Sequence, residues 1–413
     1  MTATASSSAT TATQAIIDRH DRYMSINYGR YPIAIVRGAG CEIFDAEGKR
    51  YLDLFAGFGG PILGHCHPEL VKALTEQAQK LWHVGNLFHT EPQTRLAEAI
   101  AKHGFDGRSF FCHSGADANE AAIKLARLYG QGKRYKIITT TNSFHGRSMA
   151  TMMATGQSKV REGFQPWLAG FSHVPFNDLA AMRDAIDDET VAIMIEPIQG
   201  EGGINVPSDD YLPGLRQLCD ERDLLLICDE VWTGVGRTGR WFAHQHWGIE
   251  PDIMTLAKGV GGGLAVGVMC AKERVADFYN VRKQGVVRHA TTLGGNCVSM
   301  AVSAAIFNVI EREKLHERAT ELGEYAQGRL REMAGRQRVI KQVRGKGLFI
   351  GVELDVNAGG WFKSATDVVN RCLERGLLIN GTQNTVLRIA PALVVTREQL
   401  DEGFDLLEQV LAG

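Results

Sequence analysis

Apolar positions are most clearly patterned in the middle of the chain, where short unbroken apolar runs alternate with amphipathic stretches. The runs lie at 136–141 (KIITTT), 191–197 (VAIMIEP) and 224–230 (LLLICDE). Runs this short are typical of strands buried on both faces of a parallel sheet. Amphipathic stretches between them, such as 212–223 (LPGLRQLCDERD), predict helices. The alternation predicts a doubly wound α/β domain with right-handed crossovers.

The two ends of the chain follow different patterns. Residues 28–55 alternate strand-like runs with glycine turns, which predicts a small antiparallel sheet with a hairpin at DAEGKR. After residue 315, helical stretches surround the short strands 347–354 and 386–393, which predicts a smaller α+β domain. We therefore expect a disordered tail, an N-terminal segment, a large domain and a C-terminal small domain, at residues 1–13, 14–60, 61–308 and 309–413.

Composition narrows the choice of partner. The 413 residues carry 45 Lys plus Arg against 47 Asp plus Glu, which gives no electrostatic case for nucleic acid or an anionic membrane. No apolar run reaches the length of a membrane span, and the N-terminus lacks a secretory pattern. The eight cysteines show no paired spacing. We expect a cytoplasmic protein with small-molecule partners.

Residues 65–67 (HCH) are the only stretch that suggests a metal. Adjacent ligands cannot easily converge on one tetrahedral ion, and no second cluster follows downstream. We therefore interpret this stretch as a turn and expect no metal site.

The candidate catalytic residues lie where two of the apolar runs end. One run ends on Asp229 and Glu230, and a second, at 253–257, ends on Lys258 before a glycine-rich stretch. In open α/β sheets, ligands bind outside the carboxyl ends of the strands. A buried lysine becomes a nucleophilic amine, and a buried carboxylate can keep a pyridinium nitrogen protonated. Either residue alone is more often a helix cap or a polar strand end, but the pair fits pyridoxal phosphate.

The sequence around this pair resembles a known family. DEVWTGVGRTG at 229–239, a PD dipeptide and AKGVGGG at 257–263 are similar to the core signature of class III, fold-type I aminotransferases. The resemblance covers almost everything after the first twenty residues. It implies a large, mostly parallel seven-stranded sheet domain, with the N-terminal segment packed on a smaller α+β domain. It also implies pyridoxal phosphate as cofactor, Lys258 and Asp229 as catalytic residues, and a homodimer.

A second motif predicts where the cofactor phosphate binds. Ser114 and Asp117 match a capping box at the start of an amphipathic helix, and a helix N-terminus binds phosphate through its free N–H groups. Any capped helix has this pattern. The stretch resembles the family's phosphate-binding motif, which implies that Ser114, Gly115 and Ala116 hold the phosphate. His113 replaces the usual asparagine.

HATTLGGNC at 289–297 is similar to a family loop at the dimer interface. The resemblance implies that Thr292 binds the phosphate of the neighbouring subunit and that Thr291 lies on the substrate side. A monomer is then expected to be inactive. Taken alone, the fragment is typical of an ordinary threonine-rich turn.

Further cofactor contacts follow from the resemblance. Phe144 and Val231 are expected to cover the two faces of the cofactor ring, with His145 beside it. Trp232 stands where the acetylornithine and ornithine branches usually have glutamine, which donates to the ring hydroxyl. An indole N–H can also donate but is much bulkier. Glu196, at a strand end, is expected to support the pocket.

Substrate contacts are predicted from charge. A dicarboxylic keto acid needs two cationic partners, for which arginine is well suited. The resemblance implies that Arg388 binds the α-carboxylate of glutamate and that Arg147 meets the donor's carboxylate. It also implies that Glu201 pairs with Arg388 while an ω-amine is bound. Tyr28 and Phe58 are expected on the donor side.

We therefore predict a transfer of an ω-amino group to 2-oxoglutarate, and the motifs resemble those of acetylornithine aminotransferases most. Ornithine, succinylornithine, 4-aminobutyrate and polyamines stay open as donors. A pyridoxal phosphate aminomutase or decarboxylase is the alternative within the fold. A non-catalytic binding relative is a third class, against which the intact Lys258 and Asp229 argue.

Overall fold

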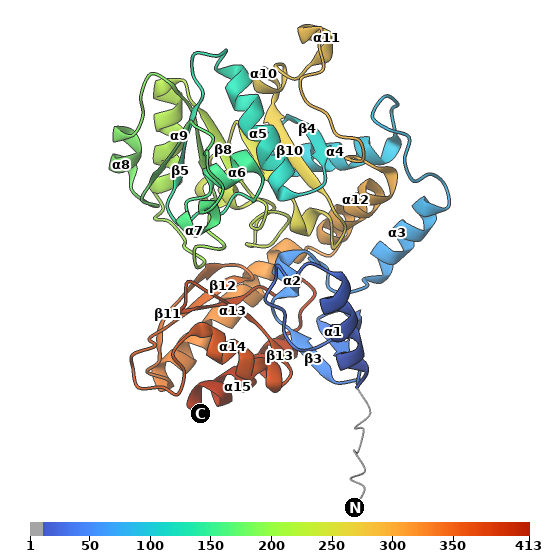
Figure 1. Cartoon of the computed structure of the whole chain (residues 1–413), viewed down its shortest axis with the longest axis vertical. Helices are drawn as coiled ribbons and strands as arrows, with labels where there is room; N and C mark the ends of the chain where they lie inside the picture. The colour runs from blue at the N-terminus through green and yellow to red at the C-terminus, as the bar shows by residue number, and fades with distance from the viewer. Residues whose placement is uncertain (1–10) are drawn as a thin grey trace, which may run out of the picture.

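The computed structural model describes residues 11–413. Most of the tail expected at residues 1–13 lies outside the described residues, and its last two residues belong to helix α1 (Ala12–Tyr23). Thr11 caps this helix by accepting from the Gln14 N–H. Figure 1 shows the N-terminal and C-terminal parts of the chain side by side beneath the large central part.

The central part is built on a seven-stranded sheet of order β4-β10-β9-β8-β7-β5-β6. Strand β10 is antiparallel to both of its neighbours, and all other pairs are parallel. The predicted mostly parallel, doubly wound sheet is thus confirmed. The strands are β4 (Gly107–Cys112), β5 (Lys136–Thr140), β6 (Phe171–Val174), β7 (Thr190–Ile195), β8 (Leu225–Asp229), β9 (Ile253–Leu256) and β10 (Gly267–Lys272).

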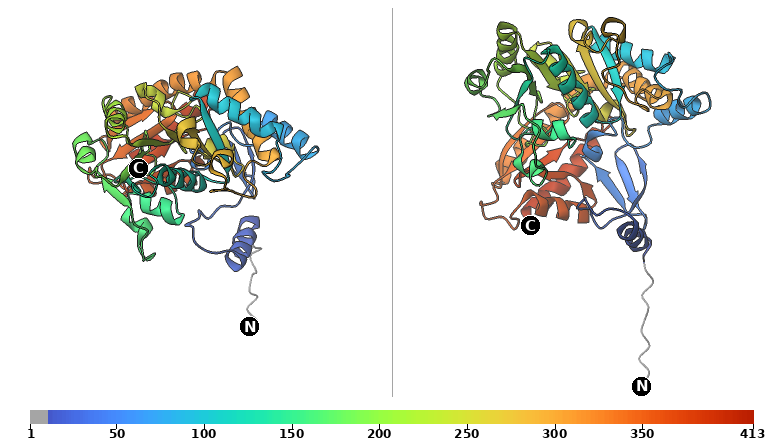
Figure 2. Two further views of the ribbon diagram at one scale, coloured as in Figure 1. Left: turned by 90° about the horizontal axis from the view of Figure 1, so that it is seen from above. Right: turned by 45° about the horizontal axis from the view of Figure 1, so that its top comes forward.

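Helices cover both faces of this sheet, which explains why its strands are apolar throughout. Along β8, Leu225 and Ile227 pack in a cluster with helix α5 (Gly115–Tyr129). The intervening Leu226 and Cys228 pack in a cluster with helix α9 (Tyr211–Arg222). Successive side chains of a strand point to opposite faces, so α5 and α9 lie on opposite sides. The two views in Figure 2 show this layering.

Further helices lie between β3 and α13 along the chain. Helix α12 packs on α3 and α4, and α3 begins at Pro68, a position where the missing N–H of proline costs nothing. The helices are α2 (Ala56–Gly59), α3 (Pro68–Ala78), α4 (Glu91–His103), α6 (Met149–Ala154), α7 (Ser158–Arg161), α8 (Leu179–Asp184), α10 (Glu273–Ala276), α11 (Val281–Gln284) and α12 (Cys297–Arg312), with 3₁₀ turns at Ala243–Trp247 and Lys258–Val260.

Two smaller sheets join the ends of the chain. In the first, β3 pairs in parallel with β13, so the N-terminal segment packs on the C-terminal part. The predicted DAEGKR hairpin connects β2 and β3, where the Asp45 N–H donates to the Lys49 carbonyl over 3.1 Å. The first sheet has the order β1 (Ile35–Ala39), β2 (Glu42–Asp45), β3 (Arg50–Asp53), β13 (Leu377–Leu378).

The second small sheet is antiparallel and is followed along the chain by the last helix. Its order is β11 (Ile340–Lys346), β12 (Phe349–Leu354), β15 (Val386–Ile389), β14 (Asn380–Thr382). The accompanying helices are α13 (Leu315–Arg336), α14 (Ala365–Glu374) and α15 (Arg397–Ala412). The exact domain boundaries expected from the sequence stay a prediction.

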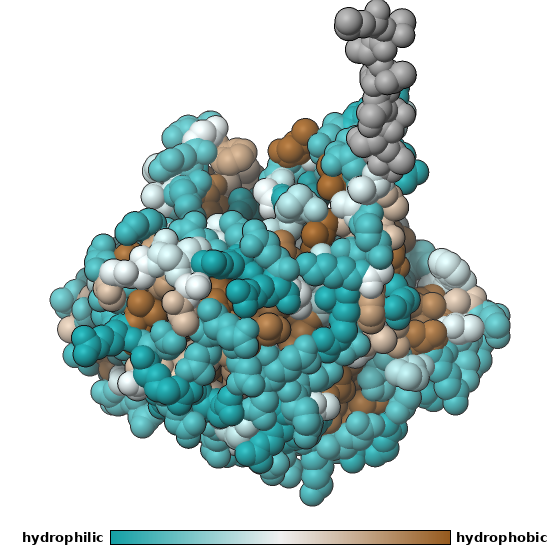
Figure 3. All heavy atoms as spheres, turned by 90° about the horizontal axis from the view of Figure 1, so that it is seen from below, coloured by the Kyte–Doolittle hydropathy of each residue, from teal (hydrophilic) through white to brown (hydrophobic). Residues whose placement is uncertain are grey.

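The face shown in Figure 3 is mostly hydrophilic, with hydrophobic residues scattered between polar ones. Within residues 11–413, none of the helices combines the length and the apolar character that a membrane crossing requires.

Candidate active site

A cavity of about 390 Å³ opens at the carboxyl ends of β5, β7, β8 and β9. This is the edge of an open α/β sheet at which ligands bind. Most of the predicted site residues line it: Ser114, Gly115, Ala116, Phe144, His145, Arg147, Glu201, Asp229, Val231, Trp232 and Lys258. Residues from segments more than a hundred positions apart are thus brought together in one site.

Asp229, the last residue of β8, is held by three donors although it is almost fully buried. Its Oδ2 accepts from Asn119 Nδ2 over 2.7 Å and lies 2.8 Å from His145 Nδ1. Its Oδ1 accepts from the Val231 N–H over 3.0 Å. Hydrogen bonds of this kind stabilise a buried carboxylate in its charged form. Asp229 can therefore present a fixed negative charge to the cavity.

Asn119, which was not among the residues predicted from the sequence, orients this carboxylate. Its amide also donates to the His145 carbonyl over 2.7 Å and accepts from the Thr255 hydroxyl over 2.6 Å. The residue sits on the buried face of α5 between small apolar residues. A lone polar residue on an otherwise apolar helix face was the available signal.

Lys258 follows β9 and reaches the cavity from a left-handed backbone conformation, with φ of +46°. This conformation costs free energy for any residue except glycine, and such strain is concentrated at functional sites. Burial lowers the pKa of Lys258 to about 8, against the opposing pull of Glu201 and Asp229. The amine therefore becomes neutral and nucleophilic at a lower pH than an exposed lysine, although most of it still carries the proton at pH 7.

The N-terminus of α5 forms the other end of the cavity. Ser114 Oγ accepts from the Asp117 N–H over 3.1 Å, as predicted. The full capping box is not formed, because the Asp117 carboxylate accepts from the Ser114 hydroxyl instead of from its backbone. A Cβ on Gly115 would lie 2.8 Å from Val231 Cγ1, so only glycine fits at this approach. A helix of fifteen residues that begins at the cavity wall suits a phosphate.

Glu196 connects two loops at the cavity. Its Oε1 accepts from the Phe144 N–H and its Oε2 from the Gly200 N–H, each over 2.9 Å. Burial raises the pKa of Glu196 to about 7. This carboxylate therefore ties the loop that carries Phe144 to the loop that leads to Glu201.

Arg388 and Glu201 form an ion pair of 3.0 Å at the edge of the cavity. Arg388 is only 2% exposed, and burial lowers its pKa while Glu201 opposes that shift. Asn380, which the sequence analysis also missed, accepts from Arg388 Nε over 2.9 Å. Because Asn380 lies on β14 beside Arg388 on β15, only strand pairing shows the connection.

Five predicted residues do not line the cavity in this single chain: Arg388, which lies at its edge, and Tyr28, Phe58, Thr291 and Thr292. Tyr28 is 66% exposed, and Phe58 lies at the edge of the site, with its ring centroid 6.2 Å from that of Trp232 and 5.8 Å from Arg388 Cζ. Thr292 is exposed, and Thr291 lies beside the His113 ring. Trp232 does line the cavity, but its Nε1 faces Gly59 and has no hydrogen-bond partner among residues 11–413. The predicted roles of these residues stay predictions.

Comparison with known proteins agrees with this geometry. Residues 23–411 match the family described as aminotransferase class III. The chain is 47% identical to an acetylornithine aminotransferase of Caldanaerobacter subterraneus, over 96% of this chain and 99% of the relative. It is 44% identical to an acetylornithine aminotransferase of Methanocaldococcus jannaschii, over 95% and 97% of the two chains.

Solved structures give the same result. The ornithine aminotransferase of Toxoplasma gondii superposes with a TM-score of 0.90 at 31% identity, covering 97% of this chain and 95% of that one. An acetylornithine aminotransferase of Elizabethkingia anophelis has a TM-score of 0.84 at 30% identity, covering 97% and 99%. The chain therefore belongs to the class III aminotransferases, and the fold, the transaminase class and the pyridoxal phosphate cofactor predicted from its motifs are confirmed.

Proposed function

We propose that this aminotransferase moves the ω-amino group of N-acetylornithine to 2-oxoglutarate, giving the semialdehyde and glutamate. The observation that carries this proposal is the Arg388–Glu201 ion pair beside Lys258. An enzyme that takes both an ω-amine and glutamate needs a cation that can be covered for one substrate and exposed for the other. The acetylornithine aminotransferases that resemble this chain support the choice of donor.

The residues of the cavity fit the cofactor. Pyridoxal phosphate, when bound, supplies an aldehyde that takes up the amino group and a cationic ring that accepts electrons released at the substrate carbon. Asp229 would hold the proton on the ring nitrogen, because its buried carboxylate is fixed by Asn119 and His145. Backbone N–H groups at the start of α5 would hold the phosphate. Phe144 and Val231 would cover the ring.

Lys258 is the proton carrier of the reaction. Its lowered pKa, about 8, lets Nζ take a proton from the substrate carbon and return it near neutral pH. Lys258 Nζ lies 3.9 Å from the centroid of the Trp232 ring, which fixes its approach from one side.

Arg388 selects between the two half-reactions. With Glu201 in place, the guanidinium is paired, so an amino acid cannot bind through its α-carboxylate. When Glu201 turns away, Arg388 binds the α-carboxylate of glutamate or 2-oxoglutarate through charge-assisted hydrogen bonds. Arg147 lines the same cavity and binds the donor's carboxylate. Tyr28 and Phe58 contribute to the donor side.

We propose a homodimer with shared active sites. Residues 81–88 form a strongly apolar exposed stretch, in which Leu87 is 95% exposed. Asn86 in this stretch donates to the carbonyls of Thr291 and Gly294, so the stretch and the threonine loop form one surface. Thr292 is exposed on that surface. A second copy packed there buries the apolar side chains and receives the Thr292 hydroxyl at its phosphate.

We also propose that the protein is cytoplasmic. All eight cysteines are free thiols, and seven of them are buried, which suits a reducing compartment.

A donor screen tests the proposed reaction. The purified holoenzyme is given N-acetylornithine, ornithine, succinylornithine, 4-aminobutyrate or putrescine with 2-oxoglutarate, and glutamate is measured. We expect the highest kcat/KM for N-acetylornithine. If another ω-amine reacts faster, that amine is the donor instead of N-acetylornithine. If product forms without any keto acid, the enzyme is a decarboxylase or an aminomutase and not a transaminase.

A further inference from the structure

Three aromatic rings surround the Arg388 guanidinium. Its Cζ lies 4.7 Å from the ring centroid of Trp232, 5.5 Å from that of Phe55 and 5.8 Å from that of Phe58. The Phe55 and Phe58 rings also pack edge to face, with centroids 4.8 Å apart. We name these three residues the aromatic cage. Each ring is within the distance at which a cation is attracted to an aromatic face.

Trp232 is held tightly in this cage. A Cβ on Gly59 would lie 2.5 Å from its Nε1, and a Cβ on Gly200 would lie 2.5 Å from its Cε3, so the indole fills a slot between two glycines. The side chain is 6% exposed, and Nε1 donates to no described residue. Its buried position is therefore explained by packing and by its π face, not by a hydrogen bond.

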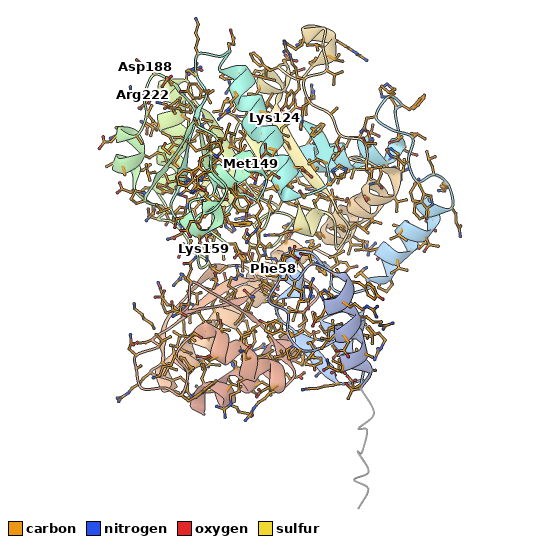
Figure 4. All side chains as sticks on the ribbon, viewed as in Figure 1. Phe58, Lys124, Met149, Lys159, Asp188 and Arg222 are labelled. Atoms are coloured by element: carbon orange, nitrogen blue, oxygen red, sulfur yellow. The ribbon has the colours of Figure 1, made fainter. Side chains whose placement is uncertain are left out.

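The segment that carries Phe58 is strained. Ala56, Gly57, Phe58 and Gly59 all have positive φ, of 47°, 50°, 61° and 84°. Consecutive left-handed residues persist only where the surrounding structure over-determines them. Phe58 lies where the large part of the molecule meets the N-terminal and C-terminal parts (Figure 4). The strained turn thus places an aromatic ring over a cation from a distant strand.

We propose that the aromatic cage is the positioning element that keeps Arg388 in its binding orientation when Glu201 turns away. This inference rests on the proposed function, in which Arg388 binds the α-carboxylate of glutamate and 2-oxoglutarate. Without Glu201, the polar partners of the guanidinium are Asn380 and the Gly200 carbonyl. Cation–π attraction in this desolvated site supplies the remaining restraint.

The cage matters more for α-carboxylates than for the ω-amine donor. Glu201 is on a loop of the same chain and can follow a displaced Arg388. A substrate carboxylate cannot follow it, because the reacting carbon must stay beside Lys258. Loosening the cage therefore weakens the binding of glutamate and 2-oxoglutarate. It leaves the binding of the donor nearly unchanged, because the donor binds while Arg388 is paired with Glu201.

The test compares Trp232→Gln, which removes the π face, with Trp232→Phe, which retains one and loses no hydrogen bond. The non-reacting dicarboxylate glutarate is titrated into each holoenzyme by calorimetry, and kcat and KM are measured for glutamate and N-acetylornithine. We expect Trp232→Gln to lower the affinity for glutarate about tenfold, the equivalent of about 1.4 kcal/mol, and to raise the KM of glutamate by a similar factor. In the same variant the KM of glutamate rises at least about threefold more than the KM of N-acetylornithine, and Trp232→Phe binds glutarate within about threefold of the wild-type affinity.

Trp247→Gln is the matched control. Trp247 is also buried, has an unpartnered Nε1 among the described residues, and lies under Lys346 Nζ at 5.3 Å, but it does not line the cavity.

Phe58→Leu is a second cage variant. The position is half-exposed, so folding is not at risk, and the affinity for glutarate should fall about threefold.

The variant Arg388→Ala distinguishes a failure of the aromatic cage from a failure of the proposed function. If Arg388→Ala abolishes glutarate binding while both cage variants bind it as the wild type does, the cage is overturned and the proposed function stands. Equal weakening by Trp247→Gln and Trp232→Gln also overturns the cage, because the effect is then general loosening. If Arg388→Ala binds glutarate normally, Arg388 is not the carboxylate anchor and the proposed function fails first.

Discussion

Replacing Lys258 by methionine should stabilise the apoenzyme at neutral pH. The lysine is buried in the cavity wall, and burial lowers its pKa from 10.5 to about 8. A lowered lysine pKa means that the folded state holds the proton less firmly than the unfolded state. Carrying the charge into the fold therefore costs free energy, and methionine, which is similar in length and uncharged, avoids that cost.

The size and pH range of the effect follow from the two pKa values. The gap between 10.5 and about 8 corresponds to roughly 3 kcal/mol of unfolding free energy. Below pH 8, both states carry the proton and the full cost is present. Between pH 8 and 10.5 the folded state gives up its proton first, so the wild type gains stability relative to Lys258→Met. Above pH 10.5 both states are neutral and this difference vanishes.

Urea unfolding of the two apoenzymes across this pH range measures the effect. The protomer concentration is kept constant, since the stability of a dimer depends on it. Lys159→Met, at an exposed lysine of α7, is the control and should show no such pH-dependent gap (Figure 4). A gap between wild type and Lys258→Met that is equal at pH 7 and at pH 10.5 would refute the reasoning.

Three further predictions concern other parts of the site. Asp229→Asn should lower turnover at least about a hundredfold, close to 3 kcal/mol, while absorbance shows that the cofactor stays bound; near-normal turnover would assign the charge to another acid. Asn119→Ala should destabilise the protein by about 2 kcal/mol in urea unfolding, since it leaves the buried Asp229 with one donor fewer, and an unchanged midpoint would contradict this. Leu87→Asp should sediment as a monomer and should have no transaminase activity. A dimer of this variant would mean that the subunits pair through another surface.

Much of the fold could be predicted because its signals are local. The alternation along 225–228, with odd residues towards α5 and even residues towards α9, produces the unbroken apolar run that predicts a doubly covered strand. Asp229 and Lys258 could be located because each directly follows such a run. The turn at DAEGKR and the capped helix start at Ser114 are likewise encoded within a few neighbouring residues.

Other features were decided only by the tertiary structure. The antiparallel insertion of β10 between β4 and β9 has no signature in its own residues. Asn119 was missed because its partner, Asp229, is 110 positions away, and Asn380 was missed because its contact with Arg388 depends on strand register.

The surroundings of Trp232 show the same division. Its identity, a tryptophan where the family resemblance leads one to expect glutamine, was visible in the chain. Its orientation was not, because the slot that holds it is formed by Gly59 and Gly200, which come from separate segments. The sequence by itself thus determined the strands, the caps and the residues that carry charge at strand ends. Packing between distant segments decided which of them meet, because hydrogen bonds and aromatic contacts depend on distances that no local pattern encodes.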